Sequence, residues 1–69
     1  MLINGDLVRV PQGTVIMEIS SDPVPIQVAT KPQIAIVIDN NPPAVDLVKV
    51  LLEDELYLVD KRVVQLVGN

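Results

Sequence analysis

The feature that most constrains this chain is its supply of β-branched aliphatic residues, set in short runs between turn-forming residues. Among 69 residues it has 13 valines and 7 isoleucines, and 6 prolines and 3 glycines divide the runs. Branching at Cβ restricts a side chain in a helix but suits the pleated surface of a strand. Pro, Gly and Asn between the runs favour turns. We therefore predict an all-β fold made of short strands.

The spacing of the turn residues predicts where these strands lie. Apolar runs between turn signals indicate strands at 7–10, 14–19, 33–39, 46–52, 56–59 and 64–67. Pro23 and Pro25 make residues 24–28 an irregular edge segment, because proline cannot donate to a ladder. The strongest break in the chain is Asn40–Pro43.

The C-terminal third admits two interpretations. The polar residues Glu53–Glu55 separate two apolar runs and predict the tip of a hairpin. Asp60 can then cap a single helical turn before the last strand. An α-helix over residues 44–67 is the alternative, since Leu47, Leu51 and Leu58 fall near helical spacing. The density of β-branched residues favours the strands.

Alternation along the strands predicts which side chains point inward. The residues expected inside are Val8, Val10, Ile34, Ile36, Ile38, Val48, Val50, Leu56 and Leu58. The residues then expected outside are Leu7, Ala35, Val37, Leu47, Leu51 and Val59. Such an outer set is too apolar for a monomer surface, where large patches mark contacts. The alternative is that these residues pack under loops at 20–33 and 39–45.

The size of the chain also favours a partner. Residues 1–69 form one domain, and a domain this small buries too little surface to be more than marginally stable. Small scaffolds usually add disulfides, a metal or another chain. The sequence contains no Cys and no His, so disulfides are excluded and transition-metal sites are disfavoured. We therefore expect a protein partner, either identical subunits or a larger protein.

Several activities are disfavoured by composition. Without His or Cys, catalysis would depend on Ser20 or Ser21 with Lys31 or Lys49, and no motif supports that arrangement. We predict no enzyme activity, no catalytic residues, no cofactor and no small-molecule substrate. A net charge of −4 opposes binding to nucleic acid. Tyr57 is the sole aromatic residue, which disfavours a groove for Pro-rich peptides.

The sequence contains one acidic run and no long apolar run. Glu53–Glu55 offers oxygen ligands for Ca²⁺ or Mg²⁺ but lacks the spacing and glycine of an EF-hand loop, so we predict a solvated hairpin tip and no metal site. No apolar run reaches the length of a transmembrane helix, and Met1–Asp6 lacks the features of a signal peptide. We expect synthesis in the cytoplasm. We expect no association with a membrane.

Two stretches of the sequence resemble a known class of proteins. Gly5-Asp6-Leu7-Val8-Arg9-Val10-Pro11 resembles the first strand of small SH3-like proteins. Val48-Lys49-Val50-Leu51 and Leu56-Tyr57-Leu58-Val59-Asp60-Lys61-Arg62-Val63-Val64 resemble the closing hairpin, helical turn and last strand of small proteins of tailed bacteriophages. The resemblance implies a small SH3-like barrel of five or six short strands, with one short helical turn before the last strand. It also implies a phage origin.

These observations lead to a functional hypothesis. We expect a non-enzymatic structural or assembly protein of a phage virion, in the capsid, neck or tail, made in the host cytoplasm and located in the virion. The expected interface residues are Leu7, Val37, Leu47, Leu51, Tyr57 and Val59. An alternative is a small acidic phage protein that binds and inhibits a host enzyme. A barrel that binds nucleic acid is the third and least favoured hypothesis.

Overall fold

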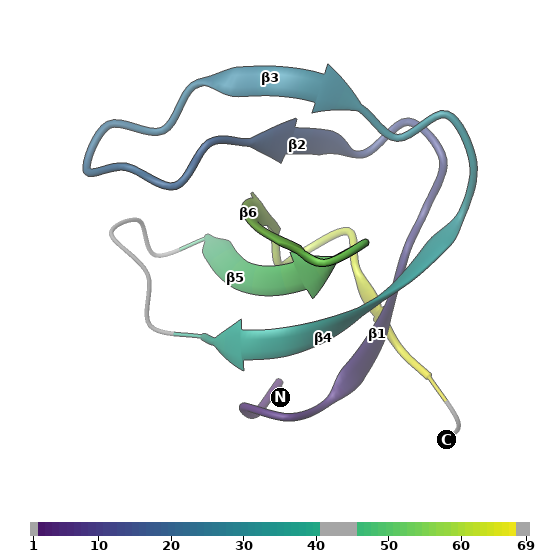
Figure 1. The fold of residues 1–69 in the computed structure, drawn as a ribbon. Coiled ribbons are helices and arrows are strands. Elements are labelled where there is room, and N and C mark those ends of the chain that lie inside the picture. Colours follow the sequence, from purple (N-terminus) through teal and green to yellow (C-terminus); the bar gives the residue numbers. More distant parts are fainter. Residues whose placement is uncertain (1, 41–45, 68–69) are drawn as a thin grey trace.

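The structure is a computed structural model that describes residues 2–40 and 46–67. The described part is all-β, with seven short antiparallel strands and no helix (Figure 1). The strands are β1 (Leu7–Val10), β2 (Val15–Met17), β3 (Pro25–Val28), β4 (Gln33–Asp39), β5 (Leu47–Leu52), β6 (Glu55–Asp60) and β7 (Gln65–Leu66). The all-β prediction is confirmed, and the helical alternative for residues 44–67 is wrong because β5, β6 and β7 lie there.

The strands form one sheet in the order β3-β2-β6-β5-β4-β1-β7. The chain folds back on itself in β4, β5 and β6, and β1 lies between β4 and β7. The sheet coils, so that β2 and β3 lie across the interior from β4 and β1 (Figure 1). It is not closed, since β3 and β7 end the strand order. Residues 24–28 lie at the β3 edge, as the prolines predicted, but residues 25–28 form a strand rather than an irregular segment. The described sheet therefore has seven strands instead of the five or six expected.

The turns explain where the strands end. Glu53 and Asp54 join β5 to β6 with φ angles of 50° and 68°, the left-handed geometry of a tight hairpin turn. The predicted polar hairpin tip is therefore confirmed. Gly13, with φ of 90°, donates its N–H to the carbonyl of Ala29 at 2.8 Å and starts β2 beside the end of β3. Of the predicted break at Asn40–Pro43, residues 41–43 lie outside the described residues.

The predicted helical turn before the last strand is a hydrogen-bonded turn instead. The N–H of Val63 donates to the carbonyl of Asp60 at 3.2 Å. The Asp60 carboxylate accepts the N–H of Arg62 at 2.8 Å, so this side chain caps the turn as expected. The turn reverses the chain directly into β7, which leaves no room for a helical segment.

The core fills the interior of the coiled sheet. Its members are small and branched: Val8, Val10, Ile16, Ala29, Ala35, Val37, Val48, Val50, Leu52, Val59 and Val64. Val8, Val10, Val48 and Val50 were predicted to be inside, and the structure confirms them. Because most core residues carry short side chains, the strands on opposite sides of the interior can approach closely.

The predicted orientation of β4 is wrong. Ala35 and Val37 are buried, while Ile34, Ile36 and Ile38 point outward and are exposed. The register decides this, because Ala35 lies opposite Val8, and directly opposed residues point to the same face. Of the residues that the alternative placed under loops, Leu7 is exposed, and Ala35 and Val37 lie in the core. The structure describes residues 39 and 40 of the loop at 39–45.

The predictions for β5 and β6 are corrected in a similar way. Leu56 was expected inside and is exposed, whereas Leu47 and Val59 were expected outside and are buried. Leu58 was expected inside and is buried as well. β6 lies in the middle of the sheet between β2 and β5. Leu58 and Val59 are successive residues that point to opposite faces of the sheet, and both are buried. Alternation of buried and exposed residues does not predict this pattern.

Candidate protein-binding face

A continuous row of aliphatic side chains crosses the outer surface of the sheet. Leu7 lies opposite Ile36, Ile36 lies opposite Leu51, and Leu51 lies opposite Leu56. Directly opposed residues lie about 4.5–5.5 Å apart on the same face, so these four side chains touch in sequence. We call Leu7, Ile36, Leu51 and Leu56 the aliphatic row. It spans β1, β4, β5 and β6.

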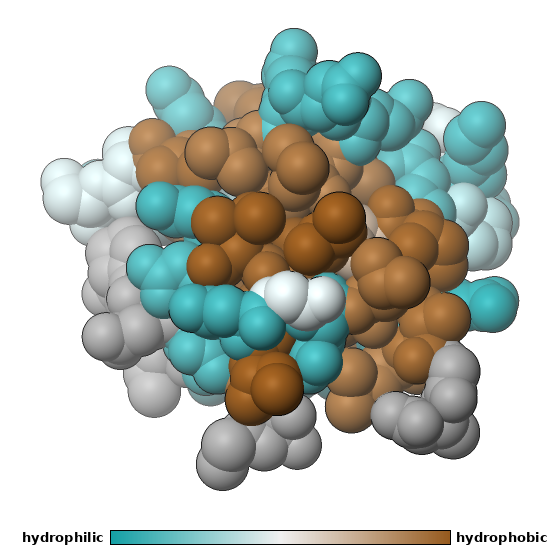
Figure 2. Space-filling model, turned by 60° about the horizontal axis from the view of Figure 1, so that its bottom comes forward, coloured by the Kyte–Doolittle hydropathy of each residue, from teal (hydrophilic) through white to brown (hydrophobic). Residues whose placement is uncertain are grey.

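The aliphatic row is open to solvent and widened along β4. Leu7 is 48% exposed, Ile36 37% and Leu56 47%, and Leu51 is half-buried. Ile34 and Ile38 extend the row on either side of Ile36, with exposures of 51% and 40%. Figure 2 shows the result as a broad apolar surface on one side of the molecule. We call the aliphatic row together with Ile34 and Ile38 the aliphatic face.

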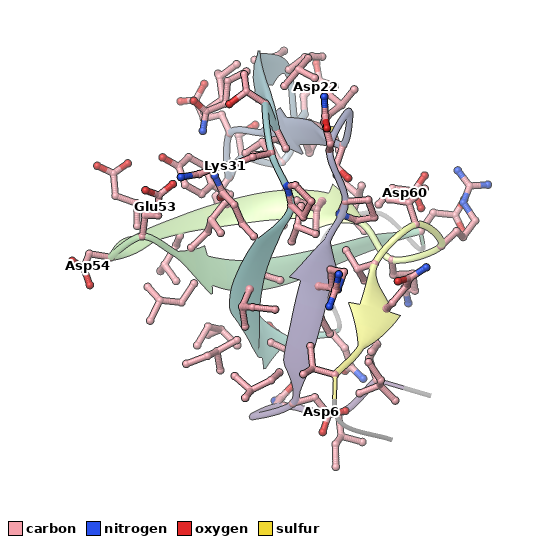
Figure 3. All side chains as sticks on the ribbon, turned by 90° about the vertical axis from the view of Figure 1, so that its right-hand side faces the viewer. Asp6, Asp22, Lys31, Glu53, Asp54 and Asp60 are labelled. Carbon is pink, nitrogen blue, oxygen red and sulfur yellow. The ribbon has the colours of Figure 1, made fainter. Side chains whose placement is uncertain are left out.

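Charged residues flank this face in an ordered way. Arg9 follows Leu7 by two residues and lies opposite Ile34, so it shares the outer face at one end of the row. At the other end, Glu53 and Asp54 form the turn between Leu51 and Leu56. Figure 3 shows Asp54 at the extreme end of this hairpin and Glu53 on the side of Lys31. The face therefore runs from a cationic end to an acidic end.

The structure brings only part of the predicted interface together. Leu7 and Leu51 lie in the aliphatic row, as expected for contact residues. Val37, Val59 and Leu47 are buried, so they cannot touch a partner without unfolding of the sheet. Their side chains hold the strands together instead.

Tyr57 lies away from the aliphatic row. It is half-buried, opposite Val50, and packs against the core. Its hydroxyl donates to the Glu55 carboxylate at 2.8 Å, and this bond raises the pKa of Tyr57 above its ordinary value. Burial of the ring and the charge of Glu55 act in the same direction. The tyrosine is thus a packing residue rather than part of the face.

Sequence reasoning missed Ile34, Ile36 and Leu56. Both sides of residues 34–38 are apolar, so alternation did not reveal which side faces the core. The sizes of the side chains could have revealed which side of this strand faces the core. Ala35 is the smallest aliphatic residue in the run and fits opposite Val8 in a narrow interior.

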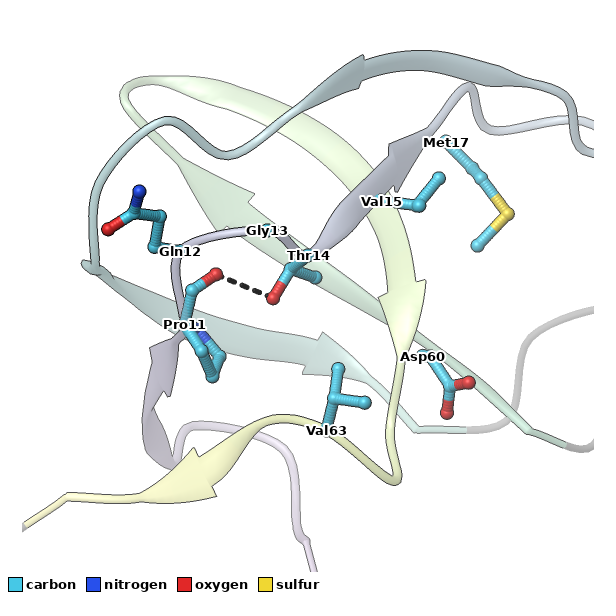
Figure 4. A pocket seen from close by; sticks show the side chains of 8 residues that line it. All are labelled: Pro11, Gln12, Gly13, Thr14, Val15, Met17, Asp60 and Val63. Atoms are coloured by element: carbon cyan, nitrogen blue, oxygen red, sulfur yellow. Dashed lines mark hydrogen bonds between the residues drawn. The ribbon is translucent and has the colours of Figure 1, made fainter.

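A hollow of about 430 Å³ lies between the turn before β2 and the turn before β7 (Figure 4). Its apolar walls include Val15, Met17 and Val63. Two of its polar groups, the Thr14 hydroxyl and the Asp60 carboxylate, already have partners. The Thr14 hydroxyl donates to the Pro11 carbonyl at 2.7 Å, which leaves that proton unavailable for other contacts.

The other polar group of this hollow is also paired. Arg62 donates to both carboxylate oxygens of Asp60, from Nε at 3.0 Å and Nη2 at 2.7 Å. These bonds lower the pKa of Asp60 and raise that of Arg62. Asp46 lies 3.6 Å from the same guanidinium. A carboxylate held in this way is a weak base, so the hollow offers packing surface rather than acid–base chemistry.

A smaller hollow of about 250 Å³ lies beside Arg9, lined also by Pro32, Gln33 and Ile34. Two of these residues, Arg9 and Ile34, lie at the border of the aliphatic face. The Oε1 atom of Gln33 is buried and accepts no hydrogen bond. Gln33 lies opposite the buried Val10, so this atom lies on the inner side of the sheet and is closed to another molecule.

In the described ranges, 2–40 and 46–67, no group of three or more acidic side chains is close enough to hold an ion. The same ranges include no helix with the length and apolar character to cross a bilayer. No protein-family model matches the chain, and no curated protein or solved structure is significantly similar to it.

Proposed function

We propose that this chain is a non-enzymatic assembly protein that attaches to another polypeptide through the aliphatic face. The observation that carries the proposal is the aliphatic row, a continuous line of exposed Leu and Ile side chains across neighbouring strands. Exposed aliphatic side chains that occur singly need no explanation, but a contiguous apolar surface marks a contact site.

The energy available from this face is large for so small a chain. Fully burying one Leu or Ile side chain contributes about 1.5–3 kcal/mol. Five of the six residues of the face are between about a third and a half exposed and Leu51 is half-buried, so covering them contributes on the order of 5 kcal/mol from this chain alone. The partner's surface adds a similar amount. The total exceeds the lower range of association costs, about 4–15 kcal/mol.

The face is also better suited to a contact than the open edge of the sheet. β3 has no strand beyond it, but Pro25 lacks an N–H and the pairing of β2 with β3 is irregular between Ile16 and Met17. Proline and irregular pairing protect an edge from strand addition. The centre of the sheet carries no such protection, because Leu and Ile occupy its outer positions.

The finer architecture that we propose is an SH3-like barrel opened between β3 and β7. The strand pairing supports it: β1 pairs with both β4 and β7, β4 to β6 form a meander, and a hairpin of β2 and β3 is inserted before β4. The stretch that resembles SH3-like proteins contains β1, and the stretches that resemble phage proteins cover most of β5 and β6 and the turn before β7.

We further propose that the chain serves in a phage virion, as a small component of the capsid, neck or tail. The small size, the resemblance and the apolar outer face support this role. The partner is a protein, either a second copy or a larger virion protein. Catalysis has no part in the proposal, because in the larger hollow the Thr14 hydroxyl is bonded to the Pro11 carbonyl and the Asp60 carboxylate to Arg62.

Mass spectrometry of purified virions tests this function. Particles of the phage that encodes the chain are produced in the presence of tagged wild type, Ile36→Lys or Ile26→Lys. Ile26 is the matched control, since it is 51% exposed but lies on β3, away from the face. We expect stoichiometric incorporation of wild type and Ile26→Lys, and loss of Ile36→Lys. Equal incorporation of all three, or absence of the wild type from particles, contradicts the proposal.

A further inference from the structure

We propose that the aliphatic face binds a second copy of this chain, with the two sheets packed face to face about a twofold axis parallel to the strands. This inference rests on the proposed function and specifies the partner of that site. The axis lies midway between the two sheets, above the boundary between β4 and β5, which is the middle of the aliphatic row. Sheets commonly pack in this way, with their strands nearly aligned and about 10 Å between them.

The aliphatic row is complementary to itself under this rotation. A twofold axis along the strands exchanges the β1 end of the row with the β6 end. Leu7 of one copy then lies over Leu56 of the other, and Ile36 lies over Leu51. Every position of the row meets a side chain of similar size and the same chemistry, as an isologous interface requires.

The flanking charges are complementary under the same rotation. Arg9 follows Leu7 by two residues, Glu53 follows Leu51 by two, and Asp54 precedes Leu56 by two. The antiparallel register places all three on the same side of the row, with the cation at one end and the acids at the other. The rotation exchanges the ends and keeps the side, so Arg9 of each copy meets the acidic tip of the other.

The shape of these regions supports the contact. The hairpin tip projects beyond the rest of the sheet (Figure 3), and the hollow of about 250 Å³ lies beside Arg9. The projecting tip of one copy therefore fits the hollow of the other.

A twofold axis along the row, across the strands, is less favourable. It would place Arg9 over the beginning of β1, near Asp6 of the other copy. The Asp6 carboxylate is half-buried and already accepts the N–H of Ile3 at 2.9 Å. The carboxylates of Glu53 and Asp54 are exposed, so they are the stronger partners for Arg9.

Charge reversal tested by sedimentation equilibrium distinguishes these possibilities. Arg9→Glu places acid against acid at both contacts, and the double variant Glu53→Lys/Asp54→Lys places base against base. We expect each variant to dissociate at least about tenfold more readily than wild type. A mixture of the two variants carries opposite charges at both contacts, so we expect it to dimerise with nearly wild-type affinity.

Folding and specificity need matched controls. Far-UV circular dichroism and thermal melting of each variant at low concentration establish that the monomers are folded. Lys49→Glu reverses a charge on the same outer face but on the opposite side of the row from Arg9 and the tip, and we expect no rescue when it is mixed with the double variant. Rescue by Lys49→Glu instead of Arg9→Glu would overturn the proposed axis. Dissociation by Ile26→Lys would overturn the proposed face.

The outcome separates this inference from the proposed function. Wild-type chain that stays monomeric at every concentration overturns the second copy as partner. If such a monomer still enters particles and Ile36→Lys does not, the function stands with a different partner. If Ile36→Lys enters particles as well as wild type does, the function fails whatever the state of the free chain.

Discussion

The two faces of β4 differ in a way that explains the molecule. The inner positions hold Ala35 and Val37, while the outer positions hold the larger Ile34, Ile36 and Ile38. A sheet that faced water on one side would show polar residues there. The comparison teaches that burial in this fold follows size, because the interior is narrow, and that the aliphatic excess on the outside requires another explanation.

The largest effect should follow a charge placed on the inner face. Val37→Asp buries a carboxylate with no partner in the core, which costs more than a marginal domain can tolerate. We expect the variant to be unfolded by far-UV circular dichroism. The same substitution on the outer face, Ile36→Asp, should leave the monomer folded. Unfolding of both variants to the same extent would contradict the assignment of the two faces.

Enlarging an inner residue should have the next largest effect. Ala35→Leu overfills the space opposite Val8 and should lower the free energy of unfolding by about 1–3 kcal/mol. Ile36→Leu keeps the volume of an outer residue and should cost less than about 1.5 kcal/mol. Urea denaturation measures both. If Ala35→Leu is tolerated as well as Ile36→Leu, the interior is not narrow.

The turn between Leu51 and Leu56 contains a residue whose substitution should stabilise the monomer. Asp54 has φ of 68°, a conformation that costs a non-glycine residue about 1–2 kcal/mol. We expect Asp54→Gly to raise the free energy of unfolding of the monomer by about 0.5–1 kcal/mol in urea. The control is Asp54→Ala, which removes the same charge without relieving the backbone and should not stabilise.

The smallest effect concerns pH and the turn before β7. Arg62 lowers the pKa of Asp60 in the folded chain, so folding favours the ionised carboxylate. The stabilisation is complete above the ordinary pKa of about 4 and is lost as pH falls through the lower pKa of the folded state. Asp60→Asn keeps an acceptor for the Arg62 N–H but removes the charge. The free energy of unfolding of Asp60→Asn should therefore be lower than that of wild type at pH 7. At pH 2 the two free energies should lie closer together.

The fold could be predicted in outline but not in orientation. The β-branched runs and the polar residues Glu53–Glu55 identify strands and a hairpin, because these are local properties. Which side of β4 faces inward is not local. Both sides are apolar, and only pairing with β1, about 28 residues earlier, decides it.

The candidate site could be predicted in part for the same reason. Leu7 and Leu51 alternate with core residues that were assigned correctly, Val8 and Val50, so their outward direction followed. Ile36 and Leu56 were missed because their strands were given the opposite phase. The continuity of the row depends on register across strands distant in sequence, which the amino-acid order does not reveal.

The most direct measurement compares solvent access at Ile36 and Ile26 in the concentrated wild-type chain. Methyl NMR with a soluble paramagnetic agent reports how closely solvent approaches each side chain. The single chain exposes both isoleucines. We predict that Ile36 becomes protected as the concentration rises while Ile26 stays accessible. Equal accessibility of the two at every concentration would contradict burial of the aliphatic face by a second copy.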